Sequence, residues 1–204
     1  MEEDAAYRNT VRLAERAARR DSFLWVDMEG SAYTDVTLDL VERALDVRPN
    51  VGVCVQAYLY RTEADVERML EAGAGIRLVK GAYDEPAGIA FPRKKDVDGN
   101  FFELSRQLLA SVDGRRAPLA FATHDGELVD RICEEAECRG VERDRFEFQM
   151  LYGIGRDLQR RLDEDGYGIR VLISYGKGWF PWYMRRLAER PANVLFALRQ
   201  ALSP

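Results

Sequence analysis

The chain has 204 residues, of which 47% are hydrophobic and 32% are charged. A chain of this length and composition can bury one sizeable core, so we expect a single domain spanning residues 1–204. Its formal net charge of −5 argues against a nucleic-acid partner, because general nucleic-acid binders carry a basic excess.

The first segment predicts one charged helix over residues 4–20, with Val11, Leu13 and Ala14 as its best apolar face. The acidic start Met-Glu-Glu-Asp lacks the basic and apolar regions of a signal peptide. No apolar stretch approaches the length of a transmembrane helix. These features predict a cytoplasmic protein.

The three cysteines, Cys54, Cys133 and Cys138, form no even framework and have no CxxC spacing. Cys54 lies in an apolar run and is expected to be a buried thiol. Free cysteines of this kind fit a reducing compartment.

After residue 22 the chain alternates between apolar, β-prone runs and charged segments with helical periodicity. The predicted strands are residues 23–28, 51–58, 76–80, 119–123, 146–151 and 169–174. The predicted helices are residues 36–45, 63–72, 101–112, 126–139 and 156–164, and then 182–202 with a break or new first turn at Pro191. Such alternation predicts βαβ units and a parallel sheet.

Polar residues at the ends of the predicted strands favour a βα barrel over a Rossmann sheet. In a barrel the carboxyl ends of all strands converge on one site, whereas in an open sheet most do not. The chain also lacks a GxGxxG motif after a strand. The polar groups in question are Asp27 and Glu29, Gln56, Arg77 and Lys80, Thr123 to Asp125, Gln149, and Tyr175.

Near the C-terminus, two adjacent guanidiniums, Arg185 and Arg186, follow an aromatic cluster that begins at Trp179. Beside a pocket the two could grip one carboxylate from two directions, because the arginine fork donates bidentate hydrogen bonds. The alternative is a solvated helix face on which Glu189 and Arg190 make weak surface pairs.

Six motifs occur in order along the chain: WVDMEGS, VCVQAYLYRT, RLVKGAYDEP, ATHD, FEFQMLYG and YMRRLAERPAN. Together they resemble the proline dehydrogenase family of the monofunctional type, over essentially the whole chain from about residue 23 to residue 202. The pair RLVKGAY and YMRRLAER is the most specific part. The resemblance implies a (βα)8 TIM-type barrel.

The resemblance also implies an activity, a cofactor and partners. Family members oxidise L-proline to 1-pyrroline-5-carboxylate with FAD as hydride acceptor, the first step of proline catabolism, and pass the electrons to a quinone. Such a protein would be cytoplasmic, with peripheral contact to the inner face of the membrane. No metal is implied.

Site residues follow from the same resemblance, position by position. Asp27 matches an active-site aspartate, and Arg77 matches a cation at the flavin N5 edge, where a fixed charge stabilises the reduced flavin. The implied cofactor contacts are Met28, Gln56, Arg77, Lys80, Gly81, Ala82, Thr123, His124 and Gln149. The implied substrate contacts are Arg185, Arg186, Tyr83, Tyr183 and Glu189.

Simpler structural roles stand beside these assignments. His124, the only histidine, could be a hydrogen-bonded structural residue. Asp27 and Glu29 could cap a helix, and Tyr83 and Tyr183 could be amphipathic residues at the core edge. Lys80 could be a solvated side chain whose backbone alone meets the cofactor.

The departures from the family are as important as the matches. The family barrel has two strands before the one that leads to Asp27, and the second carries a lysine that contacts the substrate carboxylate. We expect this chain to hold family strands three to eight only, without that lysine. On the last strand, Leu172 stands where the family has a tyrosine.

Two hypotheses from different classes follow. The first is a proline dehydrogenase present as a shortened chain, and the second is a non-catalytic barrel remnant or split-gene fragment that acts as a binding module. Another βα-barrel enzyme for a small carboxylate fits the polar strand ends but not the motifs. Six strands would leave unpaired edges, so we expect an oligomer or a poorly soluble chain that binds FAD weakly.

Overall fold

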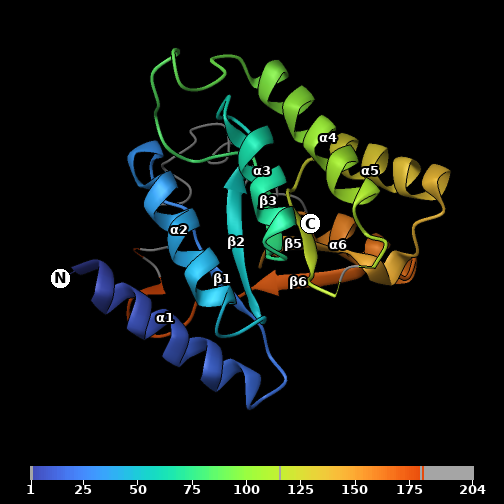
Figure 1. Cartoon of the computed structure of the whole chain (residues 1–204). Coiled ribbons are helices and arrows are strands. Elements are labelled where there is room, and N and C mark those ends of the chain that lie inside the picture. Colours follow the sequence, from blue (N-terminus) through green and yellow to red (C-terminus); the bar gives the residue numbers. More distant parts are fainter. Residues whose placement is uncertain (1, 115, 180, 182–204) are drawn as a thin grey trace.

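The computed structural model describes residues 2–114, 116–179 and 181, which form alternating helices and strands (Figure 1). In chain order these are α1 Glu2–Ala18, β1 Leu24–Val26, the 3₁₀ turn η1 Ser31–Tyr33, α2 Thr34–Leu45, β2 Val51–Gln56, α3 Thr62–Glu71, β3 Gly75–Val79, α4 Lys94–Ala110, β4 Leu119–Ala122, α5 Gly126–Arg139, η2 Arg143–Arg145, β5 Glu147–Leu151, α6 Arg156–Glu164 and β6 Gly168–Leu172.

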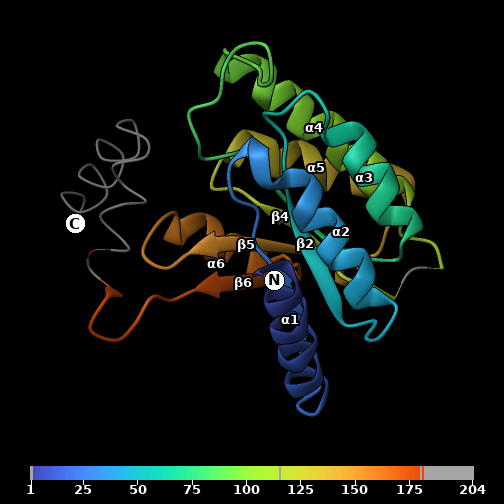
Figure 2. The same ribbon diagram turned by 60° about the vertical axis from the view of Figure 1, so that its left-hand side comes forward.

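The strands form one parallel sheet in the order β1-β2-β3-β4-β5-β6, so each strand pairs with its neighbours in sequence. The sheet curls, and α2 to α5 cover its outer face (Figures 1 and 2). A doubly wound sheet would reverse its strand order and carry helices on both faces. The predicted βα-barrel class is therefore confirmed, as an incomplete barrel.

The apolar core lies between the outer face of the sheet and the helices. On β2, the outward-facing Val51, Val53 and Val55 belong to the main core cluster, together with Phe121 of β4 and Phe148 of β5. All six residues of β2 are buried, which explains why this strand has a continuous apolar sequence rather than an alternating one.

The inner face of the curled sheet carries small and polar residues instead. Gly52 and Gly75 pair across β2 and β3, and the aromatic ring of Phe23 fills the space that their missing side chains leave. A Cβ on Gly75 would lie 2.6 Å from that ring. These two glycines therefore leave room for the Phe23 ring against the inner face, near the amino ends of β2 and β3.

Two details of the helices differ from the expectation. The fourth predicted helix begins at Lys94 rather than at residue 101, because Val97 lies one turn before Phe101 on the same buried face. In α1, Ala14 is buried whereas Leu13 is 53% exposed. The expected apolar face was wrong at Leu13, because neighbouring helical residues point about 100° apart.

Within the described part of the chain, β1 and β6 each pair on one side only. The sheet thus has two edges, and the six predicted strands all appear in the predicted order. Strand edges present unpaired backbone donors and acceptors. Closing this sheet into a barrel requires further strands between β6 and β1.

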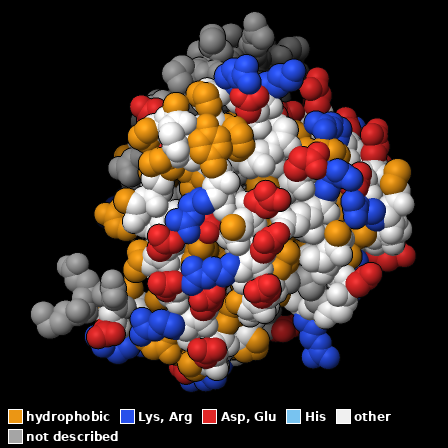
Figure 3. All heavy atoms as spheres, turned by 45° about the horizontal axis from the view of Figure 1, so that its top comes forward, with side chains coloured by type: hydrophobic (Ala, Val, Ile, Leu, Met, Phe, Trp, Pro, Cys, Tyr) orange, Lys and Arg blue, Asp and Glu red, His pale blue; other side chains and the backbone are white. Residues whose placement is uncertain are grey.

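The face shown in Figure 3 carries lysine and arginine side chains interleaved with aspartate and glutamate. On α2 and α3, Arg68 donates to Asp39 and Glu42 at 2.5 and 2.7 Å, and Arg61 donates to Asp35 at 2.5 Å. Such interleaving gives no basic patch on this face that could attract nucleic acid. Among the described residues, no helix is both long and apolar enough to cross a membrane.

Candidate active site

Arg77 lies at the centre of the inner face, on β3 and between β2 and β4. Its side chain is only 17% exposed. One guanidinium nitrogen donates to the carboxylate of Asp27, and the other lies 3.5 Å from the amide oxygen of Gln149. The guanidinium carbon is 5.4 Å from the ring centre of Trp25. Groups from β1, from the residue after it and from β5 therefore converge on the cation of β3.

Burial lowers the pKa of Arg77, and the nearby carboxylate of Glu147 opposes that shift. An arginine starts from so high a pKa that it stays charged at any relevant pH. The inner face of the sheet therefore carries a fixed positive charge on a side chain that is mostly buried. Such a charge can stabilise negative charge that develops on a bound group.

Asp27 follows β1 directly, and its side chain is 80% exposed. This carboxylate reaches across β2 to meet Arg77 on β3. Its exposure leaves one face of the carboxylate open to a ligand or to water. Asp27 does not cap a helix, because η1 begins only at Ser31 and its N-cap is Gly30.

Gln56 and Met28 lie at the ends of β2 and β1. The amide nitrogen of Gln56 donates to the backbone oxygen of Glu29 at 2.7 Å. Its amide oxygen is buried and has no hydrogen-bond partner among the described residues. Met28 is buried within the main core cluster. Of the two residues, Gln56 gives the stronger sign of a ligand, because buried polar atoms are normally paired and its amide oxygen is not.

The side chain of Lys80 is engaged in an ion cluster rather than solvated. Its ammonium contacts Asp98 of α4 at 2.5 Å and Asp125, before α5, at 2.7 Å. Lys94 contacts the same two carboxylates. Burial alone would raise the pKa of both aspartates, but the two ammonium groups lower it below the ordinary value. Only the backbone of Lys80 therefore stays available to a cofactor.

Gly81 has a backbone φ of +113°, a region that side chains rarely tolerate. A Cβ at this position would lie 2.2 Å from the ring of Tyr58. Gly81 therefore allows the chain leaving β3 to turn tightly past an aromatic ring. Ala82 follows in the same loop, so the backbone of both residues borders the carboxyl end of β3.

The loop after β3 is joined to the loop after β1 by two side chains. The hydroxyl of Tyr83 donates to Glu29. The carboxylate of Glu85 accepts from the backbone nitrogen and the hydroxyl of Ser31, each at 2.7 Å. These bonds from Ser31 hold the pKa of Glu85 below its ordinary value. The bond to Glu29 ties Tyr83 to the loop after β1.

Thr123 and His124 directly follow β4, and both accept hydrogen bonds from backbone nitrogens. The hydroxyl of Thr123 accepts from the backbone nitrogen of Asp125 at 3.1 Å. Nε2 of His124 accepts from the backbone nitrogen of Leu151 at 2.9 Å. Because Nε2 serves as an acceptor, the ring is neutral and its proton lies on Nδ1. His124 therefore joins the end of β4 to the end of β5.

This geometry predicts a pH dependence of stability. Burial lowers the pKa of His124 in the folded chain. The folded state then binds fewer protons than the unfolded state below the ordinary pKa of about 6.5. The contribution of His124 is complete above that pH and is lost as the pH falls. Thermal unfolding between about pH 7.5 and 5.5 should show this loss.

The control for this experiment is His124→Gln, which keeps an acceptor but does not titrate. Since His124 is the only histidine in the chain, its replacement should flatten the stability profile between about pH 5.5 and 7.5. An equally steep profile in the variant would show that other groups cause the dependence.

Sequence reasoning missed the pair formed by Glu147 and Arg170. The guanidinium of Arg170 donates to both carboxylate oxygens of Glu147, at 2.8 and 2.9 Å. The amide nitrogen of Gln149 donates to the same carboxylate at 2.6 Å. Spacing along the sequence could place Glu147 and Gln149 on one face of β5, but only the strand register brings Arg170 opposite them.

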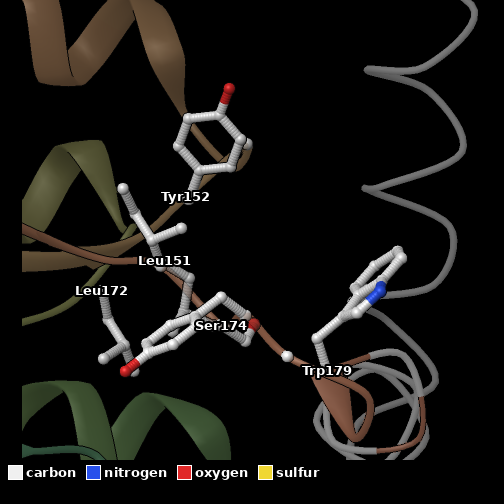
Figure 4. Close-up of a pocket in the computed structure, with 9 residues that line it drawn as sticks. Leu151, Tyr152, Leu172, Ser174 and Trp179 are labelled. Atoms are coloured by element: carbon white, nitrogen blue, oxygen red, sulfur yellow. The ribbon is translucent and has the colours of Figure 1, made fainter.

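An apolar hollow of about 550 Å³ lies at the carboxyl ends of β5 and β6 (Figure 4). Leu151, Tyr152 and Leu172 line it together with Ser174 and Trp179. Leu172 thus borders a pocket, at the position where the family resemblance implies a tyrosine. The expected substrate residues Tyr183, Arg185, Arg186 and Glu189 lie outside the described residues.

Fold and site together define an incomplete βα barrel with a polar site at the carboxyl ends of its strands. The sequence model of the family described as proline dehydrogenase matches residues 7–199. Proline dehydrogenase 2 of Bacillus subtilis strain 168 is 39% identical over 196 residues. The proline dehydrogenase of Deinococcus radiodurans is 38% identical over 202 residues. The chain belongs to the proline dehydrogenase family.

These relatives are longer than the chain. The Bacillus match covers 96% of this chain and 63% of the relative, and the Deinococcus match covers 98% and 64%. Among solved structures, a bifunctional proline utilization A protein superposes with a TM-score of 0.81 at 28% identity, over 96% of this chain and 22% of that chain. A Bradyrhizobium japonicum proline utilization A variant gives the same TM-score and identity.

Proposed function

We propose that this chain carries the FAD- and proline-binding residues of a proline dehydrogenase. The reaction is oxidation of L-proline to 1-pyrroline-5-carboxylate, with the electrons passed on to a quinone. The observation that carries this proposal is the contact of Arg77 with Asp27 and Gln149 on the inner face of the sheet, with the buried amide of Gln56 at the end of the neighbouring β2. These residues come from the motifs by which the chain resembles its family.

The residues fit a flavin. The buried amide oxygen of Gln56 has no partner among the described residues, and it suits the imide N–H that a flavin carries. Gly81, which has no side chain, exposes its backbone next to the carboxyl end of β3. Bound FAD would supply the hydride acceptor. Gln56, Arg77 and Gln149 would hold its ring, and the backbone of Lys80, Gly81 and Ala82 would border it.

The positions of the remaining described residues support the following roles. The fixed charge of Arg77 would stabilise electron density that arrives on the cofactor. Asp27, exposed and next to Arg77, would face the substrate amine. Tyr83 would cover the proline ring from the loop after β3. Thr123 and His124 would contact the cofactor from β4, mainly by placing the backbone that their hydrogen bonds hold.

The substrate carboxylate would be held by Arg185 and Arg186, with Tyr183 and Glu189 beside them. Transfer of electrons to a quinone would bring the protein to the inner face of the membrane from the cytoplasm. Residues 1–204 would form one βα-barrel domain that two further strands complete.

Removing the fork of Arg186 tests the carboxylate site. The variant Arg186→Lys keeps the charge but loses bidentate geometry, so the KM for proline should rise on the order of tenfold while FAD content stays constant. We suggest measuring this in a chimera that joins to this chain the part of the Bacillus subtilis relative lying outside the matched region. Arg93→Lys, at the exposed residue that precedes α4, is the control.

The chimera also distinguishes the enzyme from the alternative, a non-catalytic remnant. In the described sheet β1 and β6 are unpaired on one side, and this observation favours the alternative for the isolated chain. Turnover of proline on the order of 1–10 per second would support the enzyme. A yellow, folded chimera that leaves proline unchanged would instead favour a binding module.

A further inference from the structure

A row of polar side chains crosses the inner face of the sheet from β6 to β1. It runs from Arg170 through Glu147 and Gln149 to Arg77 and ends at Asp27. Each member contacts the next, and the row joins four of the described strands. The proposed function uses Arg77, Asp27 and Gln149 but gives no role to the other two.

Glu147 occupies the centre of this row. Its side chain is 18% exposed, and it accepts from Arg170 on one side and from Gln149 on the other. Gly168, its partner on β6, provides the space: a Cβ there would lie 3.3 Å from the Cβ of Glu147. The register therefore builds a place for this carboxylate on the inner face.

The carboxylate of Glu147 decides which end of the Gln149 amide faces Arg77. An ionised carboxylate only accepts hydrogen bonds, so it takes the NH2 end of the amide, at 2.6 Å. The amide oxygen must then point the other way, toward the guanidinium 3.5 Å distant. A reversed amide would set two donors against each other at Arg77 and two acceptors against each other at Glu147.

We propose that Glu147, held by Arg170, is a positioning residue for Arg77, acting through the orientation of the Gln149 amide. Arg170 contributes by fixing both oxygens of the carboxylate in a bidentate pair, although its own side chain is 66% exposed. The chemical consequence rests on the proposed function: the pair would set how Arg77 faces a bound flavin.

The structure supplies a reporter that needs no cofactor, because Arg77 lies over the ring of Trp25. The chain contains three tryptophans, so 5-fluorotryptophan labelling gives three fluorine NMR signals, and Trp25→Phe identifies the relevant one. Arg77→Gln provides the reference shift for loss of the cation. We expect Glu147→Gln and Arg170→Gln to move the Trp25 signal in the same direction.

Glu135→Gln is the matched control. Glu135 also pairs with two groups, Arg106 and Arg139, and its side chain is 21% exposed, but it lies on α5 and away from the inner face. It should leave the Trp25 signal in place. Thermal unfolding of each variant separates the two roles, since a purely structural pair would lower the melting temperature without moving that signal. An unmoved Trp25 signal in folded Glu147→Gln overturns the proposal.

A second measurement tests the consequence for the flavin. In FAD-saturated chain, Arg77→Gln and Glu147→Gln should both shift the flavin midpoint potential to more negative values, and Glu135→Gln should not. A shift in Arg77→Gln alone would overturn the positioning role. If Arg77→Gln leaves the potential unchanged, the flavin placement of the proposed function fails, while the fluorine signal still tests whether Glu147 positions Arg77.

Discussion

Arg77→Met is expected to slow the reduction of bound FAD by proline on the order of 10²-fold, the cost of removing one positioned charge at a reacting group. Arg77 is buried on the inner face and meets Asp27 and Gln149. Methionine fills similar volume without charge. Stopped-flow bleaching of the flavin band in the chimera measures the rate directly.

Folding should change little in this variant, because the Asp27 carboxylate that loses its partner is largely exposed and water can solvate it. Circular dichroism and flavin content check that point. Arg106→Met, on the outer surface of α4, is the control and should reduce at the wild-type rate. Equal rates for Arg77→Met and wild type would mean that Arg77 does not face the flavin.

Gly81→Ala is expected to destabilise the fold by about 3 kcal/mol or more, as a strained backbone and an overpacked contact combine. The new Cβ would meet the ring of Tyr58, and φ at this position is +113°. The ring is buried, so it has little room to move. Chemical denaturation of the isolated chain gives the free energy of unfolding.

Gly99→Ala is the matched control, with the opposite expected sign. Gly99 lies inside α4, is exposed, and would have nothing within 4 Å of its new Cβ. Alanine there should stabilise the helix by about 0.5–1 kcal/mol. If the free energy of unfolding changed by the same amount in Gly81→Ala as in Gly99→Ala, the turn after β3 would be able to relax around a side chain. The fold would then not require glycine at position 81, where the backbone is proposed to border the cofactor.

Sequence periodicity predicted the six strands and their order along the chain. This succeeded because apolar runs such as residues 51–58 are buried on both faces, while polar residues follow them directly. Gln56 ends β2, as the strand-end argument expects, whereas Arg77 lies in the middle of β3 on the inner face. Their roles came from the family resemblance and stay proposals.

Contacts between elements could not be predicted in the same way. The partners of Lys80 depend on where α4 begins, and the polar stretch from Lys94 to Asn100 hid that start. The pair of Glu147 and Arg170 depends on the register between β5 and β6, which a single sequence does not specify. His124 was assigned to a cofactor, and its bond to Leu151 likewise required the fold.

Strand order in this sheet also bears on how the chain folds. Each described strand pairs with the strand next to it in sequence, so every pairing closes one connection that contains a single α-helix, with a 3₁₀ turn beside it in two of the five. Local connections cost less closure entropy than long-range ones, and rates of folding rise as contacts become more local. The sheet can therefore grow one strand at a time as the polypeptide leaves the ribosome, from β1 to β6.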